Sequence, residues 1–109
     1  MTSELARATV IPYTVAKGGI KMLTLGMAAE WAKSGIQANA IVPGYMLTDM
    51  NEALVNDPEF DTWVKGRTPA GRWGKPEELI GTAIFLASRA SDYVNGQIIY
   101  VDGGMISVL

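Results

Sequence analysis

Two short apolar runs, each cut off by a glycine-containing turn, constrain the fold of this chain more than any other feature. The first run covers residues 36–42 (IQANAIV) and stops at Pro43 and Gly44. The second covers residues 96–101 (GQIIYV) and stops at Asp-Gly-Gly. Both runs are typical of strands, and the second is typical of a buried one. Because a helical pattern lies between them, we expect a right-handed crossover and a parallel pair, and hence an α/β fold.

A helical pattern also precedes the first strand. From 12 to about 34 the apolar residues form a broad surface, with a proline in the first turn and Gly35 in the position of a C-terminal cap. The second helix opens at 75–78 (KPEE), and its apolar positions through residue 87 repeat every 3.6 residues. The two glutamates of its first turn favour the positive end of the helix dipole. We therefore interpret them as dipole partners rather than as a catalytic carboxylate pair.

The segment 45–74 is long for a connection inside an α/β pattern. We expect short helices over 51–56 and 58–65 within it. Connections of this length are usually functional, so we interpret the segment as a lid over a site. The alternative is a disordered surface loop, which is disfavoured by the apolar residues spread along it: Leu47, Met50, Leu54, Phe60 and Trp63.

The composition excludes several classes of function. The chain is 49% hydrophobic and 18% charged, below the roughly 25% charged residues of an average domain, which suits a chain packed against further protein mass. Its net charge of −2 gives no basic footprint for nucleic acid. It has no cysteine and no histidine, so we expect neither a thiolate site nor a metal site. Since no apolar run approaches a membrane span and no secretion signal is visible, we expect a cytoplasmic protein without membrane contact.

Tyr13 and Lys17 are candidates for a general acid/base centre. Four residues apart on a helix, the two side chains share a face, with roughly 5–6 Å between their Cβ atoms. An ammonium that close to a phenol favours the phenolate, which can exchange a proton with a carbonyl or alcohol oxygen near neutral pH. The same spacing also describes a surface aromatic beside a snorkelling lysine. The pair alone therefore leaves both interpretations open.

Further motifs, in register with this pair, resemble the short-chain dehydrogenase/reductase family. They are 39–44 (NAIVPG) with Thr48 after it, 72–78 (RWGKPEE), and 95–104, which begins NGQ and ends VDGG. The resemblance covers essentially the whole chain, in the order of the family's C-terminal half. It implies that residues 1–109 are the C-terminal portion of one Rossmann-type domain with a doubly wound parallel sheet. Two strands, two main helices and a lid at about 45–74 would be present, and the full-length form would be a homo-oligomer.

The resemblance further implies an NAD(P)-dependent oxidoreductase. Tyr13 would act as the general acid/base while a nicotinamide cofactor transfers hydride, and Lys17 would assist the tyrosine and hydrogen-bond the nicotinamide ribose. Pro43 and Gly44 would turn the backbone sharply beside the nicotinamide, and Thr48 would hydrogen-bond the cofactor. Without the family, a strand-ending turn and a helix N-cap explain these last three residues better.

Within the family, 68–74 (TPAGRWG) and 101–105 (VDGGM) are most similar to members that act on gluconate-type sugar acids. Arg67 and Arg72 are candidates for holding the substrate carboxylate, because guanidinium forks match that group. For Arg72 the alternative is a structural pair near the start of the second helix. The Asp-Gly-Gly at 102–104 is expected to close the last strand and to shape a subunit contact, with no chemistry of its own.

Three parts of the family's active site have no counterpart in this sequence. They are the Gly-rich phosphate-binding turn, the serine that polarises the substrate carbonyl, and the helix that carries the family's active-site asparagine, which Asn39 in its strand does not replace. Because hydride transfer requires cofactor and substrate to be held in position, we expect negligible activity from the isolated chain. The alternative function is a catalytically inactive truncated product that acts at most as an association module. The choice between NAD and NADP stays open, because the residue that decides it belongs to the missing half.

Overall fold

The computed structural model describes residues 8–108. Its helices and strands follow the order α1 (Ile11–Trp31), β1 (Ala40–Pro43), α2 (Glu52–Val55), α3 (Pro58–Arg67), α4 (Ile80–Leu86) and β2 (Ile98–Val101), with short 3-10 turns between them. The two strands form a parallel sheet in which Ala40 lies opposite Ile98 and Pro43 lies opposite Val101. The predicted α/β fold with a parallel pair is confirmed.

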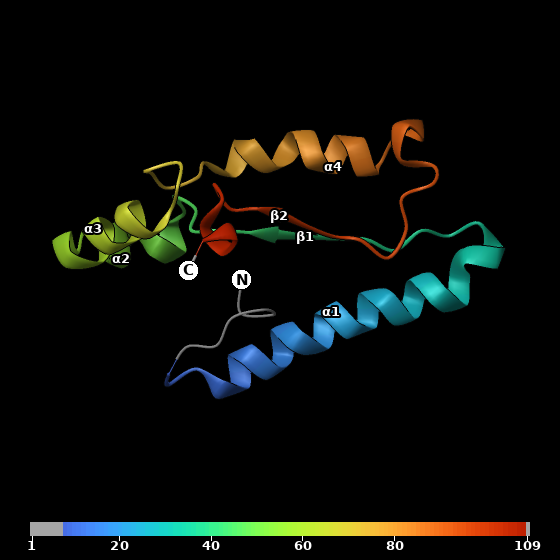
Figure 1. The fold of residues 1–109 in the computed structure, drawn as a ribbon, viewed down its shortest axis with the longest axis horizontal. Coiled ribbons are helices and arrows are strands. Elements are labelled where there is room, and N and C mark those ends of the chain that lie inside the picture. The colour runs from blue at the N-terminus through green and yellow to red at the C-terminus, as the bar shows by residue number, and fades with distance from the viewer. Residues whose placement is uncertain (1–7, 109) are drawn as a thin grey trace.

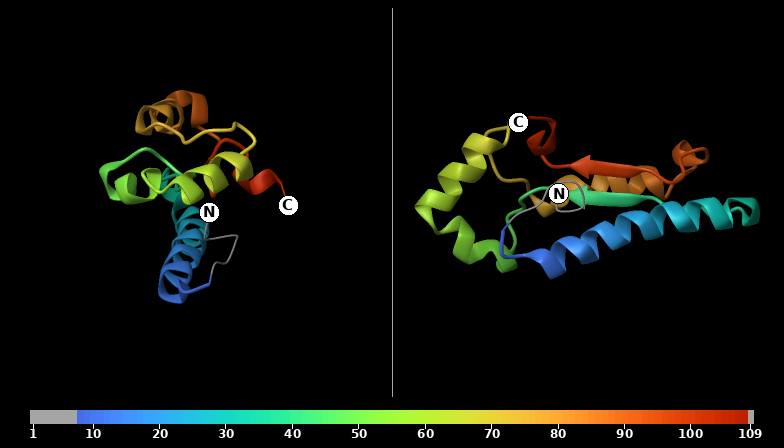
Figure 2. Two further views of the ribbon diagram at one scale, coloured as in Figure 1. Left: turned by 90° about the vertical axis from the view of Figure 1, so that its left-hand side faces the viewer. Right: turned by 60° about the horizontal axis from the view of Figure 1, so that its bottom comes forward.

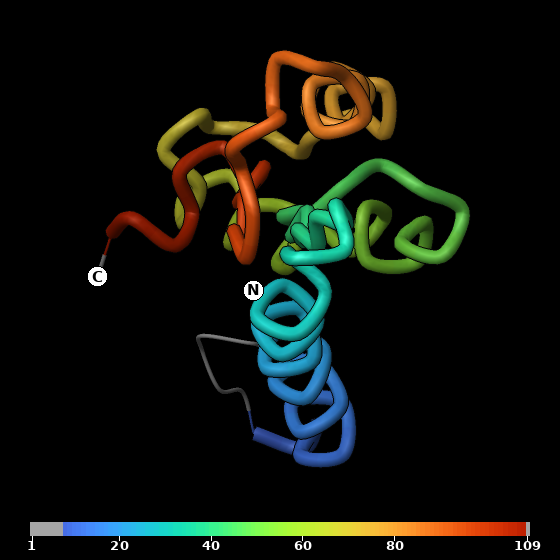
Figure 3. Tube along the Cα trace, turned by 90° about the vertical axis from the view of Figure 1, so that its right-hand side faces the viewer, coloured from blue at the N-terminus to red at the C-terminus, as the bar shows by residue number. Residues whose placement is uncertain are grey.

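The helices α1 and α4 cover opposite faces of the sheet (Figure 1). The same three layers are seen when the molecule is viewed from its two ends (Figures 2 and 3). Both strands run toward the end of the molecule where α2, α3 and the C-terminal turn gather (Figure 1). The first turns of α1 lie at this end as well. The carboxyl edge of an open parallel sheet is where α/β proteins bind ligands, so this is the end to search for a site.

The first long helix ends as the sequence predicts. After α1, a 3-10 turn at Ala32–Ser34 leads to Gly35, which has φ 75° and donates its N–H to the Ala32 carbonyl over 3.0 Å. This is the left-handed cap that glycine adopts without steric cost.

Both strands are shorter than predicted, because asparagine side chains bind the backbone that leads into them. The Ala38 N–H donates to Asn95 Oδ1 over 2.9 Å, and the Gln97 N–H donates to Asn39 Oδ1 over 2.9 Å. Asn39 also donates to the Val94 carbonyl over 2.9 Å. These side-chain bonds alternate with backbone bonds, from the Gly96 N–H to the Ala38 carbonyl over 2.9 Å and from the Ala40 N–H to the Gln97 carbonyl over 2.8 Å, so the regular ladder starts only at Ala40 and Ile98.

The prediction that the second strand is buried is wrong. All four residues of β2 are half-buried, and no residue of α4 is buried, with Ile84 63% exposed. Two strands are too narrow a sheet for the helix on each face to bury its apolar side. Most of the buried apolar side chains among the described residues lie instead at the carboxyl end of the sheet: Met46, Val64, Trp73 and Met105.

The segment 45–74 is folded around an aromatic cluster, so the disordered-loop alternative is wrong. The Tyr45 ring lies 5.6 Å from the Phe60 and Trp73 rings and 5.9 Å from the Trp63 ring, in edge-on geometry each time. The Trp73 indole N–H donates to the Asp61 carboxylate over 2.8 Å. Edge-on aromatic pairs add stability beyond the area they bury. These contacts close the segment on itself.

Among the helices of residues 8–108, none has both the length and the hydropathy that crossing a membrane requires.

Candidate functional site

A pocket of about 340 Å³ opens between α1 and β1. This volume is at the lower end of the range for small-molecule sites, about 300–1,000 Å³. One wall is helical, and the other is formed by residues 40–44 and by Ile98. The pocket brings together four residues that the sequence singled out: Tyr13, Lys17, Pro43 and Gly44.

Tyr13 and Lys17 share one face of α1, as the spacing predicts. The helix begins at Ile11 with Pro12 in its first turn, so both side chains sit on a regular turn. Lys17 Nζ lies 5.1 Å from the centre of the Tyr13 ring, within the range of a cation–π contact. The Tyr13 side chain is 54% exposed. The geometry therefore places a fixed positive charge beside a phenol that a ligand can reach.

The turn at Pro43 and Gly44 forms the edge of the same pocket, where β1 ends. Gly44 donates its N–H to the Val101 carbonyl over 3.0 Å. A Cβ atom added at Gly44 would lie 2.7 Å from the Asp102 Cα atom, which no real side chain tolerates. The structure thus explains this glycine by the close approach of the backbone that follows β2.

Thr48 is not among the residues that line this pocket. It precedes the 3-10 turn Asp49–Asn51, and its carbonyl accepts the Asn51 N–H over 2.9 Å. Its side chain caps nothing, although the position is that of an N-cap. The predicted hydrogen bond from Thr48 to a cofactor remains a prediction.

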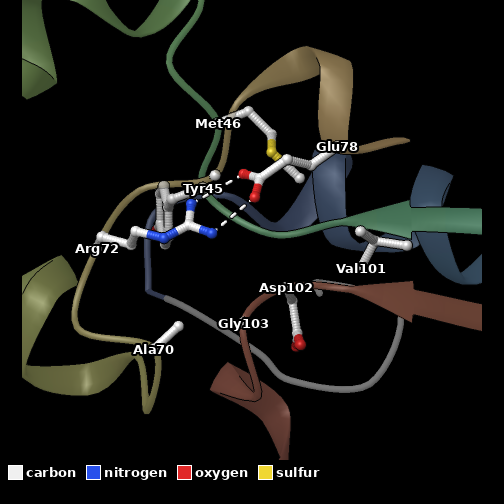
Figure 4. Close-up of a pocket in the computed structure, with 9 residues that line it drawn as sticks. Tyr45, Met46, Ala70, Arg72, Glu78, Val101, Asp102 and Gly103 are labelled. Atoms are coloured by element: carbon white, nitrogen blue, oxygen red, sulfur yellow. Dashed lines mark hydrogen bonds and ion pairs between the residues drawn. The ribbon is translucent and has the colours of Figure 1, made fainter. Parts of the chain in front are cut away.

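Arg72 is engaged in a bidentate ion pair with Glu78, which is the structural alternative for this residue. Its two terminal nitrogens donate to the Glu78 carboxylate over 2.8 Å and 2.6 Å (Figure 4). Glu78 also accepts the backbone N–H of Lys75 over 2.7 Å. The hydrogen bonds from Arg72, and then the one from Lys75, lower the pKa of Glu78 to about 2. The Arg72 guanidinium is therefore paired with Glu78 in the 3-10 turn Pro76–Leu79, which leads into α4.

Arg67 keeps part of its donor capacity. Its Nη2 atom donates to the Val108 carbonyl over 2.7 Å. Its Nη1 atom is buried and has no hydrogen-bond partner in the part of the chain that the structure describes. Of the two arginines, Arg67 is not engaged with a carboxylate in the described residues, whereas the Arg72 fork is.

Lys21, which was not among the residues predicted from the sequence, lines the same pocket as Tyr13 and Lys17. The signal was present, because Lys21 follows Lys17 by one further helical turn and so shares its face. Lys17 and Lys21 therefore lie on the same wall of the pocket. Within residues 8–108, no cluster of three or more Asp, Glu, His or Cys side chains could hold a metal ion.

Comparison with known proteins identifies the family. A family model described as enoyl-(acyl carrier protein) reductase matches residues 1–106. The chain belongs to the short-chain dehydrogenase/reductase family. It is 57% identical over 106 residues to the 5-keto-D-gluconate 5-reductase of Escherichia coli. That alignment covers 97% of this chain but 42% of the relative, so the chain spans about two fifths of the length of this dehydrogenase.

Solved structures of dehydrogenases have the same fold over this region. A candidate gluconate dehydrogenase from Agrobacterium tumefaciens is 81% identical, with a TM-score of 0.97 over 99% of this chain and 43% of its own. A gluconate 5-dehydrogenase from Burkholderia cenocepacia, solved in complex with NADP and tartrate, is 58% identical, with a TM-score of 0.95 over 99% of this chain and 42% of its own. The predicted Rossmann-type fold is confirmed.

Proposed function

We propose that this chain forms the C-terminal part of an NAD(P)-dependent oxidoreductase that interconverts the keto and alcohol forms of a gluconate-type sugar acid. The observation that carries the proposal is the pocket in which the Tyr13 phenol, the Lys17 ammonium and the turn at 43–44 face one another. The similarity to 5-keto-D-gluconate 5-reductase and gluconate 5-dehydrogenase supports the substrate class.

Tyr13 acts as the general acid/base in this proposal. In the reducing direction its hydroxyl donates a proton to the carbonyl oxygen, and in the oxidising direction it takes the proton of the alcohol. The Lys17 ammonium lies beside the Tyr13 ring, and its N–H donors suit ribose hydroxyls. A nicotinamide cofactor, when bound, supplies or accepts the hydride.

The residues of the pocket fit such a cofactor. Lys17 places an ammonium on the pocket wall, which suits a ligand that carries negative charge, and the turn at Pro43 and Gly44 keeps side chains out of the pocket edge. Thr48 is assigned a cofactor hydrogen bond, which its exposed side chain leaves available. The NADP complex of the relative from Burkholderia cenocepacia favours NADP without excluding NAD.

The segment 45–74 is assigned the role of a substrate lid, and we refer to it as the lid. Arg67, at the end of α3, is the better of the two candidates for the substrate carboxylate, because Arg72 would have to release Glu78 first. The same proposal includes a homo-oligomeric full-length form in the cytoplasm. The many apolar side chains exposed on α1 are consistent with a further protein surface there.

An inactive product that acts only as an association module is the second candidate. The observation that favours it is the set of exposed apolar side chains on α1, among them Ile11, Val15 and Met22, which suits contact with other protein. In this case the exposed face of α1 and the last strand would bind other protein, and Tyr13 would have no chemical role.

A chimera separates the two candidates. The part of the E. coli reductase that precedes the matched region is joined to residues 1–109, and NADPH- or NADH-dependent reduction of 5-keto-D-gluconate is measured. We expect an active chimera and negligible activity from the isolated chain. Tyr13→Phe should lower kcat by about 10²–10⁴-fold. Tyr93→Phe, at a fully exposed tyrosine, is the matched control and should leave kcat unchanged.

A chimera that is active and indifferent to Tyr13→Phe would exclude the proposed acid/base role. A folded chimera without activity would favour the association module instead.

A further inference from the structure

The turn at residues 102–104, which follows β2, lies between the two parts of the proposed site. It lines a second pocket of about 150 Å³, together with Tyr45, Met46 and Ala70 of the lid. Figure 4 shows Asp102 and Gly103 at the end of β2, with Ala70 on the neighbouring segment. From its sequence, this turn is expected to have a structural role only, at a subunit contact.

On one side, the turn touches the pocket that holds Tyr13. The Asp102 backbone passes so close to Gly44 that a Cβ atom on Gly44 would lie 2.7 Å from Asp102 Cα. Because close-packed backbone segments of this kind have no room to slide, the position of the 102–104 turn is fixed relative to the turn at 43–44.

On the other side, the turn contacts residues 68–70 of the lid, which we call the lid base. The Ala70 N–H donates to the Gly103 carbonyl over 3.0 Å. A Cβ atom on Gly103 would lie 2.8 Å from Thr68 Cγ2, and one on Gly104 would lie 3.2 Å from Pro69 Cγ. Both glycines have left-handed backbones, with φ 66° and 86°. The lid base therefore rests directly on a backbone that only glycine adopts easily.

A single carboxylate shapes this turn. Asp102 Oδ1 accepts the Gly104 N–H over 2.9 Å, and Asp102 Oδ2 accepts the Ile106 N–H over 3.0 Å. Hydrogen bonds to an ionised acceptor are about twice as strong as neutral ones. Met105 lies between these two bonds and is 3% exposed, so the turn is also anchored in the core.

We propose that Asp102 is a positioning residue that fixes the position of the lid base relative to the Tyr13 pocket. Its two oxygens hold the 102–104 turn, the Gly103 carbonyl of that turn holds Ala70, and the Asp102 backbone abuts Gly44. The consequence for catalysis rests on the proposed function, since it requires that the 45–74 segment covers the substrate. The structural consequence does not.

The test is hydrogen–deuterium exchange of single amides in the 109-residue chain. Asp102→Ala removes both acceptors, so the Ala70 amide should exchange about tenfold faster or more. The Ala40 amide, which donates to the Gln97 carbonyl at the far end of β1, is the reference and should not change. Asp102→Asn keeps one side-chain acceptor and should give an intermediate rate. Asp92→Ala, at an exposed aspartate, is the matched control and should leave Ala70 unchanged.

Three results would overturn the proposal. They are an unchanged rate at Ala70, an equal acceleration at Ala70 and Ala40, and an Ala70 amide that is already unprotected in the wild-type chain. In the active chimera, Asp102→Ala should raise KM for 5-keto-D-gluconate by a larger factor than it lowers kcat. Asp102→Asn should raise KM by a smaller factor than Asp102→Ala does. The exchange test needs no activity, so a failure of the proposed function and a failure of the Asp102 role are told apart.

Discussion

At the scale of single residues, the absence of a side chain at Gly44 lets the turn at 43–44 pack directly against the turn at 102–104. A Cβ atom there would approach the Asp102 Cα and Cβ atoms to 2.7 and 2.8 Å. We therefore predict that Gly44→Ala lowers the free energy of unfolding by about 1–3 kcal/mol, as overpacking of a tight contact does. Chemical denaturation of the chain measures this difference.

Gly66→Ala is the matched control for that substitution. Gly66 lies inside α3, where a Cβ atom would meet nothing within 4 Å. Replacing a helical glycine by alanine should stabilise the chain by about 0.5–1 kcal/mol. If both substitutions changed the stability in the same direction, the close approach of Gly44 to Asp102 would not be the cause.

The residue-scale predictions held where the information is local. Tyr13 and Lys17 are one helical turn apart, and the helical period alone brings their side chains to one face. The reason for Gly44 could not be predicted, because its neighbour Asp102 comes from the far end of the chain. For Arg72 the sequence left two roles open, holding a substrate carboxylate or forming a structural pair near the start of the helix, and only the folded geometry identifies Glu78 as the partner.

At the scale of secondary-structure elements, the Arg72–Glu78 pair ties the segment 45–74 to the 3-10 turn Pro76–Leu79, which leads into α4. The pKa of Glu78 falls from 4.5 to about 2 in the folded chain. A carboxylate with a lowered pKa stabilises the fold fully above its ordinary pKa, and this contribution disappears as the pH falls toward the lowered value. We predict that Glu78→Gln destabilises the chain at pH 6, and that the difference from wild type shrinks between pH 4.5 and pH 2.

Urea unfolding at several pH values measures this, with Glu77→Gln as the control. Glu77 lies on the same first turn, but the structure gives it no ion pair within residues 8–108. Its substitution should cause a much smaller change than Glu78→Gln at pH 6. A loss in Glu78→Gln that stays constant down to pH 2 would contradict the role of the ion pair.

The elements themselves were predicted best where their ends carry local signals. Pro12 and Gly35 mark α1 closely, and the proline at 58 marks the start of α3. The strands were predicted too long, because Asn39 and Asn95 bind the backbone of each other's segments across a large sequence separation. The burial of β2 was overestimated, because an apolar run shows that a strand can be buried but does not show which elements pack over it.

At the scale of the whole molecule, a narrow sheet leaves much apolar surface uncovered. Ile11, Val15 and Met22 lie on one face of α1 and are 73%, 68% and 64% exposed. In the part of the chain that the structure describes, β1 pairs only with β2, so its second edge is unpaired. Exposed apolar faces and unpaired strand edges both promote association.

We predict that the 109-residue chain self-associates as its concentration rises, and that the double substitution Val15→Lys and Met22→Lys weakens this association. Two charges on the exposed face of α1 would have to be desolvated in any contact made through that face. Ala53→Lys with Ala90→Lys adds the same charge at exposed positions outside α1 and should leave the association nearly unchanged. Sedimentation velocity over a range of concentrations distinguishes the variants. If the two double variants associated equally strongly, the α1 face would not be the contact surface, and the association would be assigned to the unpaired edge of β1.

The chimera distinguishes these two surfaces. Its preceding residues are expected to cover the β1 edge, so an association through β1 should disappear in the chimera, while an association through α1 should persist.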